Sequence, residues 1–376
     1  MRKCHIAPLA CAAALLGTAL GAAPSAAAHR VHLVKPGESI QKAVDSARPG
    51  DVVLLARGTH HGSVNVTTPG LTLRGMGRGT VLEPGKGTST ATTKPSTGSG
   101  TAEAAEAAEA AKAAGSCAAA GNGICVAGTK DHNVDYVTIA SLTVTGFSKT
   151  GVYANEADGL TVRNVTAVKN GVWGIATEHS VHGLFRDNTA RDNGDAGLFL
   201  ANTVKEEQGA TDTEGTVVEH NRLEGNRIGV TVRRLRNLTI VDNHLTRNCA
   251  GVFVVGDENK PKTGFVTVRD NRIERNNKSC PKTARLDALQ GSGIVLTGAD
   301  DNLVTHNVIK DNAGKSPLSG GIVVFKSFVG ATSERNRIID NLLRDNSPAD
   351  LVNTDPGKGN TFRDNSCRSS KPAGLC

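Results

Sequence analysis

The chain has 376 residues, and its 43 Lys and Arg against 36 Asp and Glu give a formal charge of +7. Aromatic residues make up only 3% and charges of both signs are interleaved. Nucleic-acid binders gather basic charge on one face and often add stacking aromatics, so we expect no nucleic-acid partner. Beyond the first residues no apolar run approaches the roughly 20 residues of a membrane span, so we expect none.

The first segment has the layout of a secretory signal peptide. Arg2 and Lys3 precede an apolar run over residues 6–23, and small residues end at Ala28 before His29. Cleavage there would leave one domain over residues 29–376 with a charge of +5. We therefore expect a secreted, extracellular protein whose mildly basic surface suits an anionic polymer.

Six cysteines remain after cleavage, and an even number in an exported chain indicates disulfides. Proximity in sequence favours Cys117–Cys125, Cys249–Cys280 and Cys367–Cys376. No C-x2-C spacing is present, so a zinc site is not expected.

Residues 31–83 are expected to cap the N-terminal end of the fold. A short helix over residues 40–44 has Ser39 as its N-cap, and strands are expected at 52–55, 63–66, 71–73 and 80–82. Such a helix would cover the exposed end of a stack of strands. Residues 84–116 form a low-complexity inserted loop, rich first in Gly, Ser and Thr and then in Ala and Glu.

Two asparagines five residues apart recur through the rest of the chain. The pairs are Asn188/Asn193, Asn221/Asn226, Asn243/Asn248, Asn271/Asn276, Asn307/Asn312 and Asn341/Asn346. A unit of about 22 residues, lengthened by insertions, predicts a solenoid. Apolar residues keep their place relative to each pair, so every unit supplies three short strands with alternate side chains inside.

The predicted fold class is therefore all-β, a right-handed parallel β-helix with a short N-terminal capping helix. Asparagine tolerates the left-handed conformation that a tight corner needs, and stacked asparagines can form a hydrogen-bond ladder. We expect the pairs to do both.

The chain resembles the pectate-lyase-like superfamily of right-handed parallel β-helix proteins. The resemblance rests on residues 34–41 (VKPGESIQ), 49–53 (PGDVV), 159–165 (GLTVRNV) and 193–199 (NGDAGLF). It covers nearly the whole mature chain and is specific for fold, whereas the activities in this superfamily are diverse. It implies that a substrate lies along one sheet, in a groove walled by long turns.

The longest insertions flank the strands that begin with glycine, so the sheet of these strands is the expected groove. Two residues after the glycine, Tyr153 and Phe199 should point outward and could stack on sugar rings. They could equally pack under the inserted turns. One and two positions further along the same face come Asn155, Asn202 and Lys326 as further substrate-binding candidates.

The candidate catalytic residues are Glu178, His179, Arg233 and Arg234, which should share one face two coils apart, roughly 10 Å. A lyase acting on a uronate polymer needs a basic group for the C5 proton and cations for the carboxylate. Arg233 or Arg234 could supply this basic, cationic group, with His179 as the acid. A hydrolase would instead pair Glu178 with Glu156 or Asp195. A solvated polar stripe without chemistry is the structural alternative.

No metal site is predicted, and no cofactor is named. His60 and His61 are adjacent on a strand, so their side chains should point to opposite faces. A column of Asp residues precedes the first Asn of each pair and would suit calcium, but His220 and His306 interrupt it.

The sequence thus favours a secreted β-helix protein that acts on or binds an extracellular polysaccharide, with lyase activity on a uronate-containing glycan as the leading expectation. The alternatives are a non-catalytic, adhesin-like glycan-binding module and a glycoside hydrolase with paired carboxylates.

Overall fold

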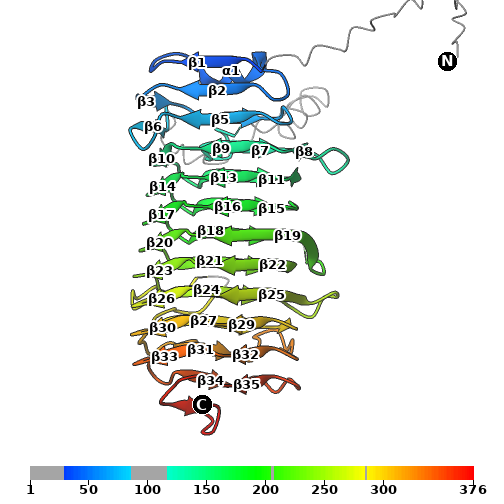
Figure 1. The fold of residues 1–376 in the computed structure, drawn as a ribbon, viewed down its shortest axis with the longest axis vertical. Coiled ribbons are helices and arrows are strands. Elements are labelled where there is room, and N and C mark those ends of the chain that lie inside the picture. The colour runs from blue at the N-terminus through cyan, green and yellow to red at the C-terminus, as the bar shows by residue number, and fades with distance from the viewer. Residues whose placement is uncertain (1–28, 86–116, 205–206, 284–285) are drawn as a thin grey trace, which may run out of the picture.

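The computed structural model describes residues 29–85, 117–204, 207–283 and 286–376. The expected signal peptide and most of the inserted loop 84–116 lie outside these residues. The described chain winds into a tube whose coils stack from the N-terminal cap to the C-terminal coil (Figure 1). Each full coil contributes one strand to each of three sheets, here called A, B and C, and the strands within each sheet pair in parallel. The predicted parallel β-helix is confirmed.

The bounds of the strands follow the three sheets. Sheet A holds β1 (Val31–Val34), β2 (Val52–Leu55), β5 (Thr72–Gly75), β9 (Thr138–Ala140), β13 (Thr161–Arg163), β16 (Leu184–Arg186), β19 (Thr211–Glu219), β22 (Leu235–Val241), β25 (Thr263–Arg269), β28 (Ala299–Asp300), β29 (Leu303–Thr305), β32 (Arg337–Ile339) and β35 (Thr361–Arg363). Sheet B holds β3 (Gly58–His61), β6 (Thr80–Glu83), β10 (Thr143–Thr145), β14 (Thr166–Val168), β17 (Thr189–Arg191), β20 (Arg222–Glu224), β23 (His244–Thr246), β26 (Arg272–Glu274), β30 (Val308–Lys310) and β33 (Leu342–Arg344). Sheet C holds β4 (Val64–Val66), β7 (Ile124–Ala127), β11 (Thr150–Asn155), β15 (Trp173–Glu178), β18 (Ala196–Ala201), β21 (Ile228–Arg233), β24 (Ala250–Val255), β27 (Ser292–Thr297), β31 (Gly320–Val324), β34 (Leu351–Asn353) and β36 (Ser370–Lys371). Two further strands, β8 (Val134–Asp135) and β12 (Ala157–Asp158), pair at the corner between sheets C and A.

The helix α1 (Ile40–Ser46) closes the N-terminal end of the tube. The Ser39 hydroxyl accepts a hydrogen bond from the Lys42 amide at 3.2 Å, which confirms the predicted N-cap. Ile40 and Val44 are buried in the main core, so the helix covers the first coil with its apolar side. No helix in the described part of the chain is long and apolar enough to cross a membrane.

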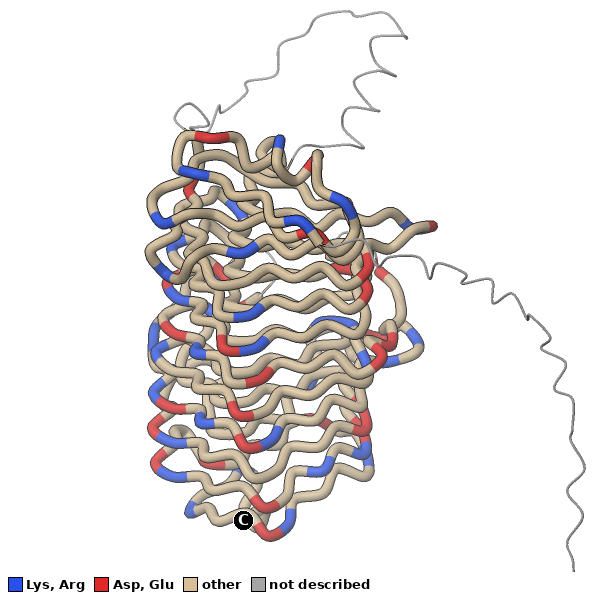
Figure 2. The backbone as a smooth tube through the Cα atoms, turned by 45° about the horizontal axis from the view of Figure 1, so that its top comes forward, with Lys and Arg blue, Asp and Glu red and all other residues tan. Residues whose placement is uncertain are grey.

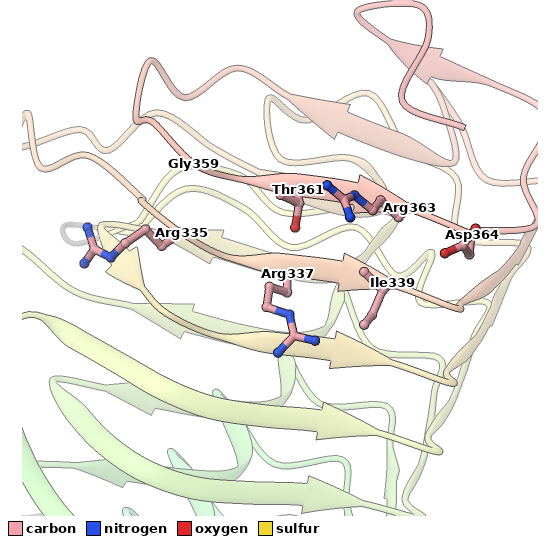
Figure 3. A pocket seen from close by; sticks show the side chains of 7 residues that line it. All are labelled: Arg335, Arg337, Ile339, Gly359, Thr361, Arg363 and Asp364. Carbon is pink, nitrogen blue, oxygen red and sulfur yellow. The ribbon is translucent and has the colours of Figure 1, made fainter.

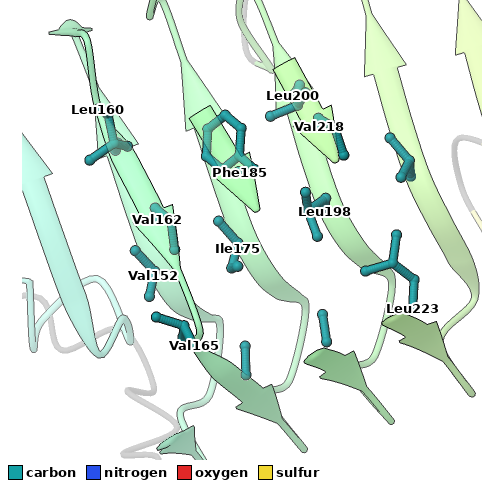
Figure 4. Close-up of a cluster of buried hydrophobic side chains, with 14 of the residues drawn as sticks. Val152, Leu160, Val162, Val165, Ile175, Phe185, Leu198, Leu200, Val218 and Leu223 are labelled. Atoms are coloured by element: carbon teal, nitrogen blue, oxygen red, sulfur yellow. The ribbon is translucent and has the colours of Figure 1, made fainter. Parts of the chain in front are cut away.

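The core of the tube consists of stacked aliphatic columns. Val152, Ile175 and Leu198 pair in register on β11, β15 and β18, and each is fully buried. Figure 4 shows these side chains facing others from sheets A and B, such as Val162, across the interior. Alternation along each strand therefore sends every second side chain into the tube, as the pattern predicted.

The asparagine ladders are confirmed. The first members bond in the order Asn188, Asn221, Asn243, Asn271, Asn307, Asn341 and Asn365, and the second members run from Asn170 through Asn193, Asn226, Asn248, Asn276 and Asn312 to Asn346. At each step a side-chain oxygen accepts the backbone N–H of the Asn in the preceding coil. In most steps it also accepts that residue's side-chain amide. The ladders thereby satisfy buried polar groups at two corners.

The left-handed conformation predicted for the paired asparagines is wrong. It belongs to the residue before them, with φ of +56° at Asp187, +53° at His220 and +54° at Asp242. The side chain of this corner residue is exposed to solvent and so can vary. The Asn that follows must instead direct its amide inward to the neighbouring coil.

All three predicted disulfides are present, joining Cys117 to Cys125, Cys249 to Cys280 and Cys367 to Cys376. The prediction for the two histidines is also confirmed. His60 is buried and its Nε2 lies 2.9 Å from the Ala56 carbonyl oxygen, whereas exposed His61 faces Glu83.

Candidate functional site

The outer face of sheet C is closed over much of its area by a second hydrophobic cluster. Phe199 and Phe253 point away from the tube, yet they are only 6% and 3% exposed. The ring of Phe199 stacks on Trp173 with centroids 4.3 Å apart. Leu289 and Leu318, from the inserted turns, belong to the same cluster. Phe199 is therefore buried in this cluster and does not present its ring to solvent, so the packing alternative for this residue is confirmed and its role as a sugar platform is not.

The inserted turn 277–291 is tied down on this face. The disulfide Cys249–Cys280 joins it to the start of β24. The guanidinium of Arg227, which is 6% exposed, donates to the carbonyl oxygens of Pro281 at 2.6 Å and Asp287 at 3.0 Å. Burial lowers the pKa of Arg227 below its usual value. A disulfide and two hydrogen bonds thus hold the covering turn against sheet C.

A polar stripe remains accessible where the strands of sheet C end. Asn155, Glu178, Ala201 and Arg233 occupy one row across β11, β15, β18 and β21. Asn155, Glu178 and Arg233 are each partly exposed. The strand spacing places Glu178 and Arg233 roughly 10 Å apart on the same face, as predicted.

Tyr153 and Glu178 form the first contact of this stripe. The Tyr153 hydroxyl donates to Glu178 Oε1 at 3.0 Å, and the Val204 amide donates to Oε2 at 2.9 Å. Burial and the adjacent Glu178 carboxylate raise the pKa of Tyr153 well above its usual value. Tyr153 is consequently held as a neutral phenol whose hydroxyl donates to Glu178.

His179 lies at the corner that follows β15, in the left-handed conformation with φ of +47°. Its Nδ1 is 3.3 Å from Asn155 Oδ1 and 3.7 Å from Glu156 Oε1. The side chain is 32% exposed. A neutral imidazole that donates from Nδ1 to these oxygens would have Nε2 as its proton acceptor, which is the arrangement of a general base.

The other candidates that the sequence places at this corner, Arg234 and Asn202, are buried. Arg234 is 5% exposed and its guanidinium pairs with Asp257, a partner that the sequence reasoning missed. Asn202 is 1% exposed and its amide donates to the Gly209 carbonyl at 2.7 Å. Their burial removes both from direct contact with a ligand. Lys326 is exposed at the end of sheet C, but it lies several strands from His179.

The carboxylates considered for hydrolysis do not come together as a free pair. Asp195 precedes β18, whereas Glu178 faces the last residue of that strand, so the two lie roughly 20 Å apart. Asp195 instead accepts a hydrogen bond from Trp173 Nε1 at 3.1 Å. Glu156 is near Glu178, but both Glu178 oxygens already accept hydrogen bonds.

Within the described ranges no three His, Cys, Asp or Glu side chains converge on a metal position. The corner acids are spread along the tube, where several pair with arginines, such as Asp187 with Arg186 and Asp270 with Arg269. Figure 2 shows basic and acidic residues interleaved along the corners, as predicted.

A shallow depression of about 440 Å³ lies on sheet A, between β32 and β35. It is lined by Arg335, Arg337, Ile339, Gly359, Thr361, Arg363 and Asp364, which Figure 3 shows on this open part of the sheet. The depression is on a different sheet from His179 and has no part in the stripe.

Comparison with protein families matches residues 115–264 and 261–376 to the right handed beta helix region. The chain belongs to this family, and the predicted handedness of the coil is thereby confirmed. No curated protein matches the chain.

Several solved structures share this fold. The mannuronan C-5 epimerase A-module of Azotobacter vinelandii is 17% identical, with 88% of this chain and 92% of that one covered and a TM-score of 0.54. The alginate lyase of a Paenibacillus species is 15% identical, with 88% and 99% covered and a TM-score of 0.55. A DFA-IIIase from Arthrobacter chlorophenolicus is 14% identical, with 90% and 84% covered and a TM-score of 0.58. At these identities the likeness is one of fold.

Proposed function

We propose that the protein is an exported enzyme that cleaves a uronate-containing polysaccharide by β-elimination. The observation that carries the proposal is the pairing of an oriented imidazole with a neutral phenol on one exposed stripe. His179 has its Nδ1 directed at Asn155, and Tyr153 is held protonated beside Glu178. The names of similar folds, an alginate lyase and a mannuronan C-5 epimerase, agree with such a substrate class.

In the proposed reaction Nε2 of His179 removes the proton at C5 of a uronate. The electrons of the C5–H bond form a C4–C5 double bond, and the C4–O4 bond breaks. The departing O4 takes the proton of Tyr153, so one chain becomes two, one of them with an unsaturated end. Arg233, two strands away, offers positive charge to the uronate carboxylate as negative charge develops there.

These roles differ from those expected from sequence in two respects. His179 becomes the base in place of an arginine, because its Nδ1 contacts leave Nε2 to accept the proton. Tyr153 becomes the acid, and Arg234 is removed from the site by its pairing with Asp257. Glu178 positions the phenol and the turn that begins at Val204.

The test is to incubate the purified protein with alginate, polygalacturonate and glucuronan and to follow the ultraviolet absorbance of unsaturated products. Changing His179→Ala or Tyr153→Phe should lower kcat by about 10²- to 10⁴-fold, the usual contribution of a general acid or base. His220→Ala is the matched control, because it removes another exposed, left-handed corner histidine far from the stripe. Binding of these polymers without product would refute cleavage and support the glycan-binding module.

A further inference from the structure

Tyr136 is an unusually exposed aromatic residue at the corner between sheets C and A. Its side chain is 71% exposed, and its φ is +53°. Its N–H bonds to the Asp158 carbonyl oxygen and the preceding Asp135 carbonyl accepts from Gly70, so its neighbours at this corner are glycines, Gly70 and Gly159. A Cβ at Gly159 would lie 2.7 Å from Cδ1 of the Tyr136 ring. The Cδ1 and Cε1 edge of the ring thus lies against glycine backbone, and most of the ring is exposed.

The corner that Tyr136 occupies is left-handed in several coils, and glycine suits this conformation best. The left-handed conformation costs a non-glycine residue roughly 1–2 kcal/mol, and a bulky residue is rarely found there. Gly70 and Gly159 adopt it in the adjacent coils without that cost, with φ of +67° and +65°. The open ring face buries little apolar area in return. Because His182, Phe265 and other non-glycine corner residues adopt the same conformation, the distinctive feature of Tyr136 is its exposed ring beside two glycines.

Two aspartates lie next to Tyr136 in the chain and in the following coil. Asp135 and Asp158 pair in register on β8 and β12, directly before Tyr136 and Gly159. Asp158 Oδ1 lies 2.7 Å from His182 Nδ1, and Glu214 Oε2 lies 3.1 Å from Nε2 of the same ring. An open aromatic face beside carboxylates matches a sugar ring, which has an apolar face and hydroxyl donors at its edge. The local negative charge would repel a uronate.

The platform lies next to the candidate site. Gly159, under the Tyr136 ring, follows Glu156 by three residues, so the two are roughly 10 Å apart along an extended chain. The turn between β7 and β8 projects from the tube beside it (Figure 1), and its residues Thr129–Asn133 are exposed. A saccharide that passes the stripe would therefore meet Tyr136 at the adjoining corner.

We propose that Tyr136 is a stacking platform for an uncharged sugar, with Asp135 and Asp158 accepting hydrogen bonds from its hydroxyls. If the proposed cleavage is also correct, the substrate is a polysaccharide in which neutral sugars accompany uronates. The binding claim stands without the cleavage claim, because retention by a neutral polymer needs no turnover.

The experiment is affinity electrophoresis of the whole protein in gels containing β-1,4-glucan, mannan, xylan, carboxyl-reduced alginate or untreated alginate. At least one neutral polymer should retard the protein. Tyr136→Ala should weaken that binding about 3- to 10-fold, the range of an aromatic contact, and Tyr136→Phe should preserve it.

Phe265→Ala is the matched control, because Phe265 is also exposed and left-handed but has the Arg236 guanidinium over its ring at 4.5 Å. The Phe265 variant should bind as the wild type does. The inference is overturned if no neutral polymer retards the wild type, or if Tyr136→Ala binds as tightly as Phe265→Ala. Measuring the His179→Ala variant in the same gels separates the two proposals, since it should lose cleavage and keep retention.

Discussion

Replacing one asparagine in the middle of a ladder should destabilise the tube well beyond an average substitution. Asn248 is fully buried, and its Oδ1 accepts from the Asn226 backbone at 2.9 Å and from the Asn226 amide at 3.2 Å. Its own amide donates to Leu223 O at 3.0 Å and Asn276 Oδ1 at 2.9 Å. Asn248→Ala leaves at least the Asn226 N–H and the Leu223 carbonyl short of a partner. Each such buried group costs about 1–3 kcal/mol, so we expect a loss of about 3–5 kcal/mol.

The measurement is urea unfolding followed by circular dichroism, with the slope compared between variants because solenoids can unfold in parts. Asn360→Ala is the matched control. Asn360 accepts the same two bonds, from Asn336 at 3.0 and 2.9 Å, but it is partly exposed, so water can replace them. We expect the control to lose less than half as much free energy of unfolding. Equal losses in the two variants, or a loss under about 1 kcal/mol for Asn248→Ala, would refute the argument from buried polar groups.

Two further predictions concern a buried charge and a disulfide. The hydrogen bond from Arg272 holds the pKa of Glu274 at about 2, with His244 also in contact, against 4.5 for the free group. The ionised Glu274 therefore stabilises the fold above pH 4.5, and this contribution is lost as the pH falls toward 2. The melting temperature of Glu274→Gln should accordingly fall less between pH 7 and pH 3 than that of the wild type. An equal fall in the melting temperatures of the wild type and Glu274→Gln would contradict this prediction. The double variant Cys249→Ser, Cys280→Ser opens a loop of 31 residues and should lower the free energy of unfolding by about 3–4 kcal/mol, measured by urea titration. A change under about 1 kcal/mol would show that Arg227 holds the turn without the disulfide.

The fold could be predicted from sequence because every coil repeats the same local rules. The asparagines marked the register, so the row that joins Glu178 to Arg233 followed by counting. The cover over sheet C could not be counted in this way. Phe199 is buried in a cluster with Trp173 and with Leu289 and Leu318 from the inserted turns, and these turns have no repeat pattern from which their packing could be predicted.

The residues of the candidate site could likewise be predicted only in part. Arg233 and Arg234 are adjacent in sequence, yet one side chain lies on the stripe and the other pairs with Asp257, from the turn after the neighbouring strand β24. Tyr153 was a candidate either to stack on sugars or to pack under the turns, and its hydrogen bond to Glu178 could not be predicted from sequence. Tyr136 carried no motif at all, and its interest arises from the exposure of its ring.

The ladder through the second asparagines also has a direction. At each step from Asn170 the donor belongs to the earlier coil and the acceptor to the later one, and Asp350 ends the series by accepting from the backbone and amide of Asn346 at 3.2 and 2.8 Å. Aligned amide dipoles place their positive end at the C-terminal coil, where a carboxylate is the complementary partner, much as anions suit the N-terminus of a helix. A lengthened tube would therefore accept new coils between existing ones but not after Asp350, because growth beyond that residue would have to move the terminating charge with it.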